Sequence, residues 1–262
     1  MNRGIIYEIC CDSLQSALNA QQAGAHRVEL CSALELGGIT PSYGLIQQVR
    51  KRVKLELNVL IRPRGGDFLY ESEEVAVMIS DIQACAGLGV NGVVIGALDP
   101  YGNVDMDTCR ALVAVARHLG LSVTFHRAID RARNIYEALE DIIDLGVDRV
   151  LTSGGAPTAL AGLDTIAKMN QIAAARSAGA GHTERAVKTI IMPGAGINAS
   201  NIREIIARTG AREIHFSASA TYDSPMLWRG DATESPLFHP NSFIRHESSL
   251  SKIQETIAAA TN

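Results

Sequence analysis

The chain has 262 residues, of which 47% are hydrophobic and 20% charged, a composition typical of one large soluble domain or two small ones. A formal net charge of −4 at pH 7 argues against a nucleic-acid partner, because phosphate contacts need clustered lysine and arginine. The sequence has no run of about 18 apolar residues and only five cysteines, none in a CxxC pair, so we expect a cytoplasmic protein with reduced thiols and no membrane partner.

The predicted elements alternate between strands and helices along most of the chain. A first strand over "GIIYEIC" (4–10) leads into a helix that Asp12 or Ser13 can cap. A glycine-terminated helix followed by a β-branched strand then recurs in "QAGAHRVELC", "GLGVNGVVIG", "HLGLSVTFHR", "DLGVDRVLTS" and "RTGAREIHFS". Strands over "KLELNVLI" (54–61) and "KTIIMPGAG" (188–196) complete a set of eight.

Eight β/α units in about 250 residues predict a (β/α)8 TIM barrel, an α/β fold, over residues 1–220. An open doubly wound sheet is the alternative, but no GxGxxG follows the first strand. A small-residue insertion, "RSAGAGHTERAVK" (176–188), precedes the seventh strand. Residues 221–262 are expected to form an irregular C-terminal extension, ending in a helix, that packs on the barrel or on a partner subunit. In it, Trp228 is either an anchor to the barrel or a second subunit, or a local surface residue.

Polar residues gather where the predicted strands end, which is the face of a barrel that carries the active site. In "LNVLIRPRGGDF" (57–68) the third strand runs into Arg62 and Arg64, which strand parity turns toward the barrel axis. Because an unpaired buried charge is costly, Glu8 and Glu29 are expected to neutralise these two arginines. The group is either a neutral ion network that holds the barrel mouth together or a functional site. The number of other polar groups at the same end favours a site.

Glycine-rich turns follow the sixth and seventh strands. "TSGGAPTAL" and "MPGAGINASN" each lead into a helix N-terminus, and "FSASAT" follows strand eight. Barrels often bind phosphate with these last loops, because backbone N–H groups and the helix dipole favour an anion. The predicted anion-binding residues are Arg62, Arg64, Arg127, Ser153, Gly154, Gly194, Gly196 and Ser217. Tight packing of the turns is the alternative explanation.

Acid–base groups are present at the same predicted face. The candidate catalytic residues are Glu8, Glu29, His126, Asp130 and His215, with Asp130 placed to orient His126 or Arg127. No lysine lies at an inward strand end, which disfavours Schiff-base aldolase chemistry. A nucleophile elbow, a P-loop and a zinc HExxH are absent from the sequence. These residues do not define a reaction.

A Glu-x-Cys pattern occurs on both of the first two strands, at Cys10 and Cys31. Neighbouring parallel strands lie about 4.8 Å apart, so the two thiols could meet. Soft thiolates select Cu(I), but a buried free cysteine also behaves as a small hydrophobic residue. Both interpretations are open on these residues alone.

Longer stretches of the sequence resemble the CutC family, which is named for copper tolerance. They are "EICCDSLQSALNAQQAGAHRVELCSALELGGITPSYG", "IRPRGGDFLY", "VTFHRAID", "RVLTSGGAPTALAGL", "IMPGAG" and "EIHFSASA". The resemblance implies a cytoplasmic TIM-type barrel, dimeric or of higher order, with Cu(I) bound in some members by cysteines that correspond to Cys10 and Cys31. No reaction is securely attached to the family. The sequence departs from the family at Ile129, where phenylalanine is usual, at 177–188 and after Gly230, which leaves the subunit interface open.

Two functions therefore follow from the sequence. The first is a copper homeostasis protein that binds Cu(I) through Cys10 and Cys31. The alternative is a barrel enzyme that acts on a small anionic substrate, phosphorylated or not, at the mouth lined by arginine, histidine and glutamate.

Overall fold

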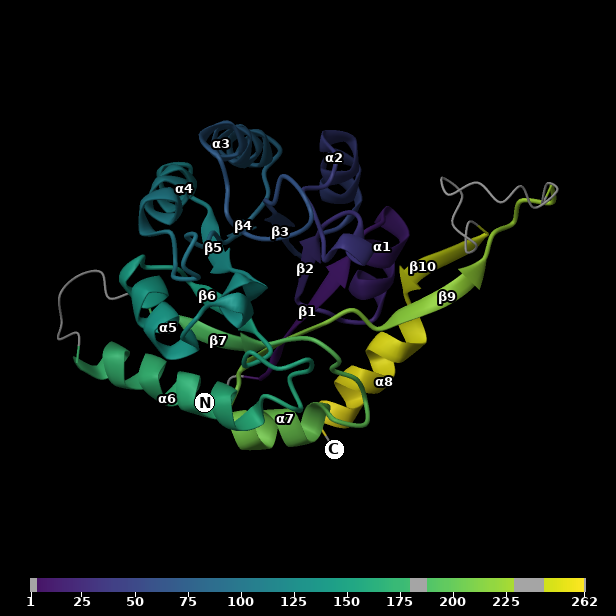
Figure 1. Ribbon diagram of the computed structural model, residues 1–262. Coiled ribbons are helices and arrows are strands. Elements are labelled where there is room, and N and C mark those ends of the chain that lie inside the picture. The colour runs from purple at the N-terminus through teal and green to yellow at the C-terminus, as the bar shows by residue number, and fades with distance from the viewer. Residues whose placement is uncertain (1–3, 180–187, 229–242, 262) are drawn as a thin grey trace.

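The computed structural model describes residues 4–179, 188–228 and 243–261 (Figure 1). Its centre is one parallel sheet whose strands are β1 (Ile6–Cys11), β2 (Arg27–Leu30), β3 (Glu56–Leu60), β4 (Gly92–Ile95), β5 (Ser122–Phe125), β6 (Arg149–Thr152), β7 (Ile190–Pro193) and β8 (Glu213–Phe216). The order in the sheet is β7-β6-β5-β4-β3-β2-β1-β8, and β7 and β8 at its two ends contact one another. The sheet thus nearly closes, and the predicted (β/α)8 TIM barrel is confirmed.

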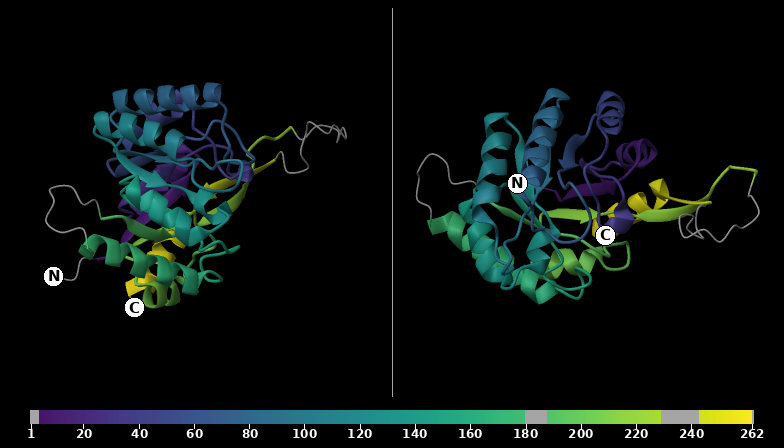
Figure 2. Two further views of the ribbon diagram at one scale, coloured as in Figure 1. Left: turned by 60° about the vertical axis from the view of Figure 1, so that its left-hand side comes forward. Right: turned by 45° about the horizontal axis from the view of Figure 1, so that its top comes forward.

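Helices cover the outside of the sheet (Figures 1 and 2). They are α1 (Leu14–Gln22), α2 (Tyr43–Arg52), α3 (Ser72–Gly87), α4 (Met106–His118), α5 (Ile135–Asp144), α6 (Leu163–Gly179), α7 (Ile202–Thr209) and α8 (Leu250–Thr261), with 3-10 turns η1 (Leu34–Leu36) and η2 (Arg127–Arg131). The five glycines of the recurring phrase have positive φ values between 69° and 85°, as expected for helix ends. Ser13 caps α1 by accepting a hydrogen bond from the Ser16 N–H.

The C-terminal segment contains a second, two-stranded sheet. β9 (Ser219–Asp223) pairs with β10 (Ile244–Ser248) in an antiparallel ribbon that projects from the barrel in every view (Figures 1 and 2). Residues 219–248 carry no periodic pattern that predicts this ribbon. After it, α8 contacts α7 and α1 and so takes the eighth helical position around the barrel. Residues 180–187 of the predicted insertion and 229–242 of the extension lie outside the described residues.

Trp228 follows the outer end of β9 and is 73% exposed, and its neighbour Leu227 is 96% exposed. Trp228 therefore does not anchor the extension to the barrel of its own chain. Within the described ranges, no helix is long and apolar enough to cross a membrane.

Strand parity determines which side chains enter the barrel. Leu57, Val59 and Ile61 of the third strand region pack in the large apolar core between sheet and helices. Leu60 instead belongs to a small inner cluster with the two cysteines Cys10 and Cys31 and with Val94. The rest of the interior near this cluster is polar, which is unusual because barrel interiors are dominated by branched apolar residues.

Candidate functional site

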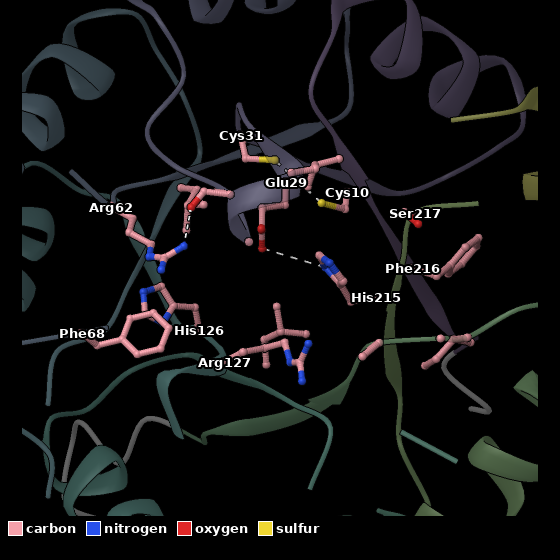
Figure 3. Close-up of a pocket in the computed structure, with 18 residues that line it drawn as sticks. Cys10, Glu29, Cys31, Arg62, Phe68, His126, Arg127, His215, Phe216 and Ser217 are labelled. Atoms are coloured by element: carbon pink, nitrogen blue, oxygen red, sulfur yellow. Dashed lines mark hydrogen bonds and ion pairs between the residues drawn. The ribbon is translucent and has the colours of Figure 1, made fainter. Parts of the chain in front are cut away.

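A cavity of about 280 Å³ opens at the carboxyl ends of the barrel strands (Figure 3). Its volume lies just below the usual range for ligand sites, about 300–1,000 Å³, so it suits a small molecule or an ion. The predicted site residues that line it are Cys10, Glu29, Cys31, Arg62, His126, Arg127, Gly196, His215 and Ser217. Glu8, Arg64, Asp130, Ser153, Gly154 and Gly194 are not among the lining residues.

The floor beneath the cavity is a buried ion network. Arg27, at 1% exposure, donates to the carboxylates of Glu8 and Glu213, and Arg149 donates to Glu213 over 2.7 Å. Burial alone would raise the pKa of Glu8, but Arg27 and His215 outweigh it and lower that pKa to about 2. The sequence-based expectation that Glu8 neutralises an arginine of the mouth is therefore wrong, because Glu8 is committed to Arg27.

Two thiols form one wall of the cavity. The Sγ atoms of Cys10 and Cys31 lie 3.9 Å apart, and both residues are buried. The backbone register explains the contact: Cys10 pairs with Glu29 on the adjacent strand, and the Cys31 N–H donates to the carbonyl of Cys11 one step further along. The hydrogen bond with Cys31 and burial raise the pKa of the Cys10 thiol, so it is protonated when no ligand is bound.

Glu29 and His215 lie beside Cys10. One ligand atom from each of these three residues falls within 4.8 Å of the others, a spacing that could hold a metal ion. Nδ1 of His215 is 2.8 Å from Oε1 of Glu8 and 3.9 Å from Oε2 of Glu29. Burial works to lower the pKa of His215, but Glu29 and the other polar neighbours raise it overall. Burial raises the pKa of Glu29 to about 7, although His215 acts in the opposite direction.

Arg62 lies across the cavity from His215 (Figure 3). Its guanidinium donates to the carbonyls of Leu36, Gly38 and Gly66 over 2.7–3.0 Å and stacks on the ring of Phe68, 4.8 Å from its centroid. It forms no ion pair with any carboxylate among the described residues. The expectation that Glu29 neutralises Arg62 is therefore wrong.

Arg64 points away from the cavity. Its side chain is 40% exposed and pairs with Asp67 and Glu74. Strand β3 ends at Leu60. Arg62 still lines the cavity, but the alternation expected through Pro63 does not bring residue 64 there. Only one of the two predicted mouth arginines thus reaches the site.

His126 follows β5 and is 5% exposed. Its Nδ1 accepts a hydrogen bond from the Ala128 N–H over 3.1 Å, while its buried Nε2 has no protein hydrogen-bond partner. Burial and the charge of Arg62 lower the pKa of His126 to about 3, so the ring is neutral. A neutral imidazole whose Nδ1 is an acceptor carries its hydrogen on Nε2.

Asp130 organises the loop after β6. Its carboxylate accepts hydrogen bonds from the N–H groups of Ser153 and Gly155 and from the Thr152 hydroxyl, and it forms an ion pair with Arg127 at 2.8 Å. The Gly154 N–H donates to Thr152 Oγ1. The glycine turn that the sequence presents as an anion site already holds an anion, the carboxylate of Asp130. Asp130 orients Arg127 and has no hydrogen bond to His126.

Sequence reasoning missed the floor arginines and the loop that covers one side of the cavity. Arg27 shares strand parity with Glu29 and Cys31, and Glu213 shares it with His215. Strand alternation could therefore have predicted that Arg27 and Glu213 face the barrel interior. The loop residues Leu34, Gly37 and Gly38, together with Phe68, carry no periodic signal and reach the cavity only through the tertiary fold.

Comparison with known proteins places these residues within one family. Residues 5–220 match the sequence model of the CutC family. A CutC family protein of Xylella fastidiosa (strain Temecula1) is 52% identical over 211 residues, covering 80% of this chain and 74% of that protein. The human copper homeostasis protein cutC homolog is 43% identical over 229 residues, covering 87% and 79%. A crystal structure of the copper homeostasis protein CutC from Streptococcus agalactiae aligns with a TM-score of 0.71 at 28% identity, covering 81% of this chain and 98% of that one. The matched range contains every residue that lines the cavity.

Proposed function

The chain belongs to the CutC family, and from that premise we propose that it binds Cu(I) as cargo through Cys10 and Cys31. The observation that carries the proposal is the contact between the two sulfur atoms, 3.9 Å apart in the wall of a cavity that opens to solvent. Sulfur is the ligand type that selects Cu(I) over harder cations. The human relative is named a copper homeostasis protein, which agrees with this assignment.

The neighbouring groups suit a metal that binds at the protonated Cys10 thiol. Cys10 is protonated without metal, so binding releases protons. Glu29, whose pKa is raised to about 7, lies close enough to Cys10 to accept a proton from it. Leu60 and Val94 pack with both cysteines in the inner apolar cluster.

Copper competition tests this proposal. Reduced, metal-free protein is titrated anaerobically with Cu(I) in the presence of a chromophoric Cu(I) chelator. We expect the double variant Cys10→Ala/Cys31→Ala to lose more than about 100-fold in affinity, because even the removal of groups that only orient metal ligands costs about 10–100-fold. Cys11→Ala is the matched control, since Cys11 is the next residue on the same strand but packs in the outer core. Equal affinities in wild type, control and double variant would reject the site.

A second candidate function is supported by Arg62. We propose that the same cavity serves an enzyme that acts on a small anionic substrate, with Arg62 and Arg127 as anion-binding residues and Glu29, His126 and His215 as acid–base groups. A buried guanidinium without a carboxylate partner is costly unless an anion completes it, and a thiol site for copper does not require it. Loss of anion binding in Arg62→Gln, with Cu(I) affinity retained, would support this function. Unchanged binding of every anion tested would remove its basis.

We also propose a cytoplasmic homo-oligomer, a dimer or a higher assembly. The exposed apolar residues Leu227 and Trp228 at the end of β9 support a subunit contact there. Light scattering of wild type and of Leu227→Ser/Trp228→Ser tests it. The expected result is a smaller particle for the variant, and an unchanged mass would exclude this contact.

A further inference from the structure

Two further donors lie beside the two cysteines of the proposed copper site. One ligand atom each of Cys10, Glu29 and His215 lies within 4.8 Å of the others, and Sγ of Cys31 is 3.9 Å from that of Cys10. Figure 3 shows the four side chains together at one end of the cavity, across from Arg62. All four line the cavity, so an ion from solvent has a path to them. Two sulfur atoms, a ring nitrogen and a carboxylate oxygen therefore meet at this end.

The separation of the two sulfur atoms indicates how many ligands an ion between them takes. Two thiolates that bind one ion at about 2.3 Å lie about 4.6 Å apart around a linear ion, about 4.0 Å apart around a trigonal ion and about 3.8 Å apart around a tetrahedral ion. The 3.9 Å between Sγ of Cys10 and Sγ of Cys31 falls between the last two values. The thiol pair is thus spaced for an ion with three or four ligands, and not for a linear ion held by sulfur alone.

His215 has the surroundings of a metal-binding histidine. Its Nδ1 is 2.8 Å from Oε1 of Glu8, and the carboxylate of Glu8 is fixed in turn by Arg27. Histidines that bind metal almost always donate one ring N–H to a carboxylate or a similar acceptor, which orients the ring and makes the other nitrogen a better ligand. The ion network beneath the cavity therefore supplies the outer support that a histidine ligand needs.

Glu29 offers the fourth donor. The residue is 5% exposed, and within the described part of the chain its Oε2 has no hydrogen-bond partner. Nδ1 of His215, at 3.9 Å from this oxygen, is too distant for a hydrogen bond. Because buried polar atoms are almost always paired, the oxygen lacks a partner that the chain does not supply. It has almost no contact with solvent, so that partner is an ion held between the side chains and not a molecule in the open cavity.

We propose that Cys10, Cys31, His215 and Glu29 bind a divalent ion of the zinc class with four ligands. The inference rests on the proposed use of both cysteines as metal ligands, and it extends that site to a second metal and to two more donors. Zinc in proteins is bound by sulfur, imidazole nitrogen and carboxylate oxygen, which are the donor types present. A divalent ion also cancels the charge of two thiolates, whereas Cu(I) cancels only one, and unbalanced charge is costly where it is buried.

Titration with Co²⁺ tests the site, because four-coordinate Co²⁺ replaces zinc and, unlike zinc, is coloured. The full-length protein is reduced, freed of metal and titrated anaerobically. We expect intense visible bands from four-coordinate Co²⁺ and a near-ultraviolet thiolate-to-cobalt band, and Zn²⁺ should abolish both by displacing the ion. His215→Phe should weaken Co²⁺ binding about 100-fold or more, since losing a group that only orients a ligand already costs about 10–100-fold. His118→Phe, exposed at the end of α4, is the matched control and should bind as wild type does.

The outcomes separate this inference from the copper site on which it rests. If Cu(I) binds through both cysteines but Co²⁺ gives no thiolate band, the copper proposal stands and the divalent site is wrong. If neither Cu(I) nor Co²⁺ binding depends on Cys10→Ala/Cys31→Ala, both proposals fail. Co²⁺ affinity equal to wild type in His215→Phe would overturn the four-ligand site.

A second variant keeps the test decisive if His215→Phe loses its fold by circular dichroism. Glu29→Gln then replaces it, because glutamine keeps the size of the side chain and removes its negative charge. We expect Co²⁺ binding to weaken about 10-fold or more and the visible bands to change, since one ligand of the ion is altered. An affinity and a spectrum equal to those of wild type in Glu29→Gln would reject the proposed set of four ligands.

Discussion

Replacing Arg27 by methionine is expected to destabilise the barrel more than any single change on its surface. Arg27 is 1% exposed and donates to two buried carboxylates, Glu8 and Glu213. Methionine fills a similar volume but leaves both carboxylates without this cation, and breaking a buried ion pair costs about 3–5 kcal/mol. The lowering of the Glu8 pKa from 4.5 to about 2 corresponds to about 3 kcal/mol, which is the same order of magnitude.

Urea denaturation of wild type and Arg27→Met at pH 7 measures the effect. Arg110→Met is the control, because Arg110 pairs with Asp107 on the surface and its loss should change the free energy of unfolding by less than about 1 kcal/mol. A depressed folded-state pKa contributes stability above the unfolded value of 4.5 and loses it as the pH falls toward about 2. The gap between wild type and Arg27→Met should therefore shrink over that acid range. A loss below about 1 kcal/mol at pH 7, or a gap that widens in acid, would refute this account of the floor.

Three further predictions concern the site. Apparent Cu(I) affinity should rise between pH 6 and 8, about tenfold per unit for each thiol proton displaced, because the Cys10 pKa is raised by Cys31 and burial; affinity that is constant over this range contradicts thiol ligation. Asp130→Ala should lower the free energy of unfolding by about 2–4 kcal/mol in chemical denaturation, since the Ser153 and Gly155 N–H groups lose their acceptor, and a change near zero would disprove its role in the loop. Gly96→Ala places a Cβ 2.6 Å from Nδ1 and Cε1 of His126, so it should lower the free energy of unfolding in chemical denaturation by about 1–3 kcal/mol. Gly44→Ala, where a Cβ meets nothing within 4 Å, is its control, and equal free energies of unfolding in the two variants would contradict the tight packing of Gly96 against His126.

The barrel could be predicted from sequence because its signal is local and repeated. Each glycine that ends a helix, such as Gly89 or Gly146, requires a left-handed conformation, and a buried strand follows within a few residues. The ribbon of β9 and β10 could not be predicted in this way. Its strands pair across a long intervening segment, and most of their residues are exposed, so alternation of apolar residues is absent.

The sequence predicted many of the residues that form the site but not which of them pair with one another. Strand parity predicted that four residues meet at one end of the barrel, and all four line the cavity: Cys10, Cys31, Glu29 and His126. Which charge meets which depends on distances between strands that the sequence does not contain. Glu8 therefore pairs with Arg27 rather than with an arginine of the mouth.

Asp130 is a second contact that the sequence could not predict. A glycine-rich turn after strand six signals an anion, and an anion is indeed present, but the chain supplies it from its own η2 turn. A turn motif reports that N–H groups converge and does not report whether a nearby carboxylate has already occupied them.

Copper X-ray absorption of the Cu(I)-loaded protein decides whether Cys10 and Cys31 together hold Cu(I). Binding by both thiols requires a first coordination shell with two sulfur atoms, lost in Cys10→Ala/Cys31→Ala and retained in Cys11→Ala. A shell of nitrogen and oxygen alone, or the same sulfur shell in the double variant, would contradict it.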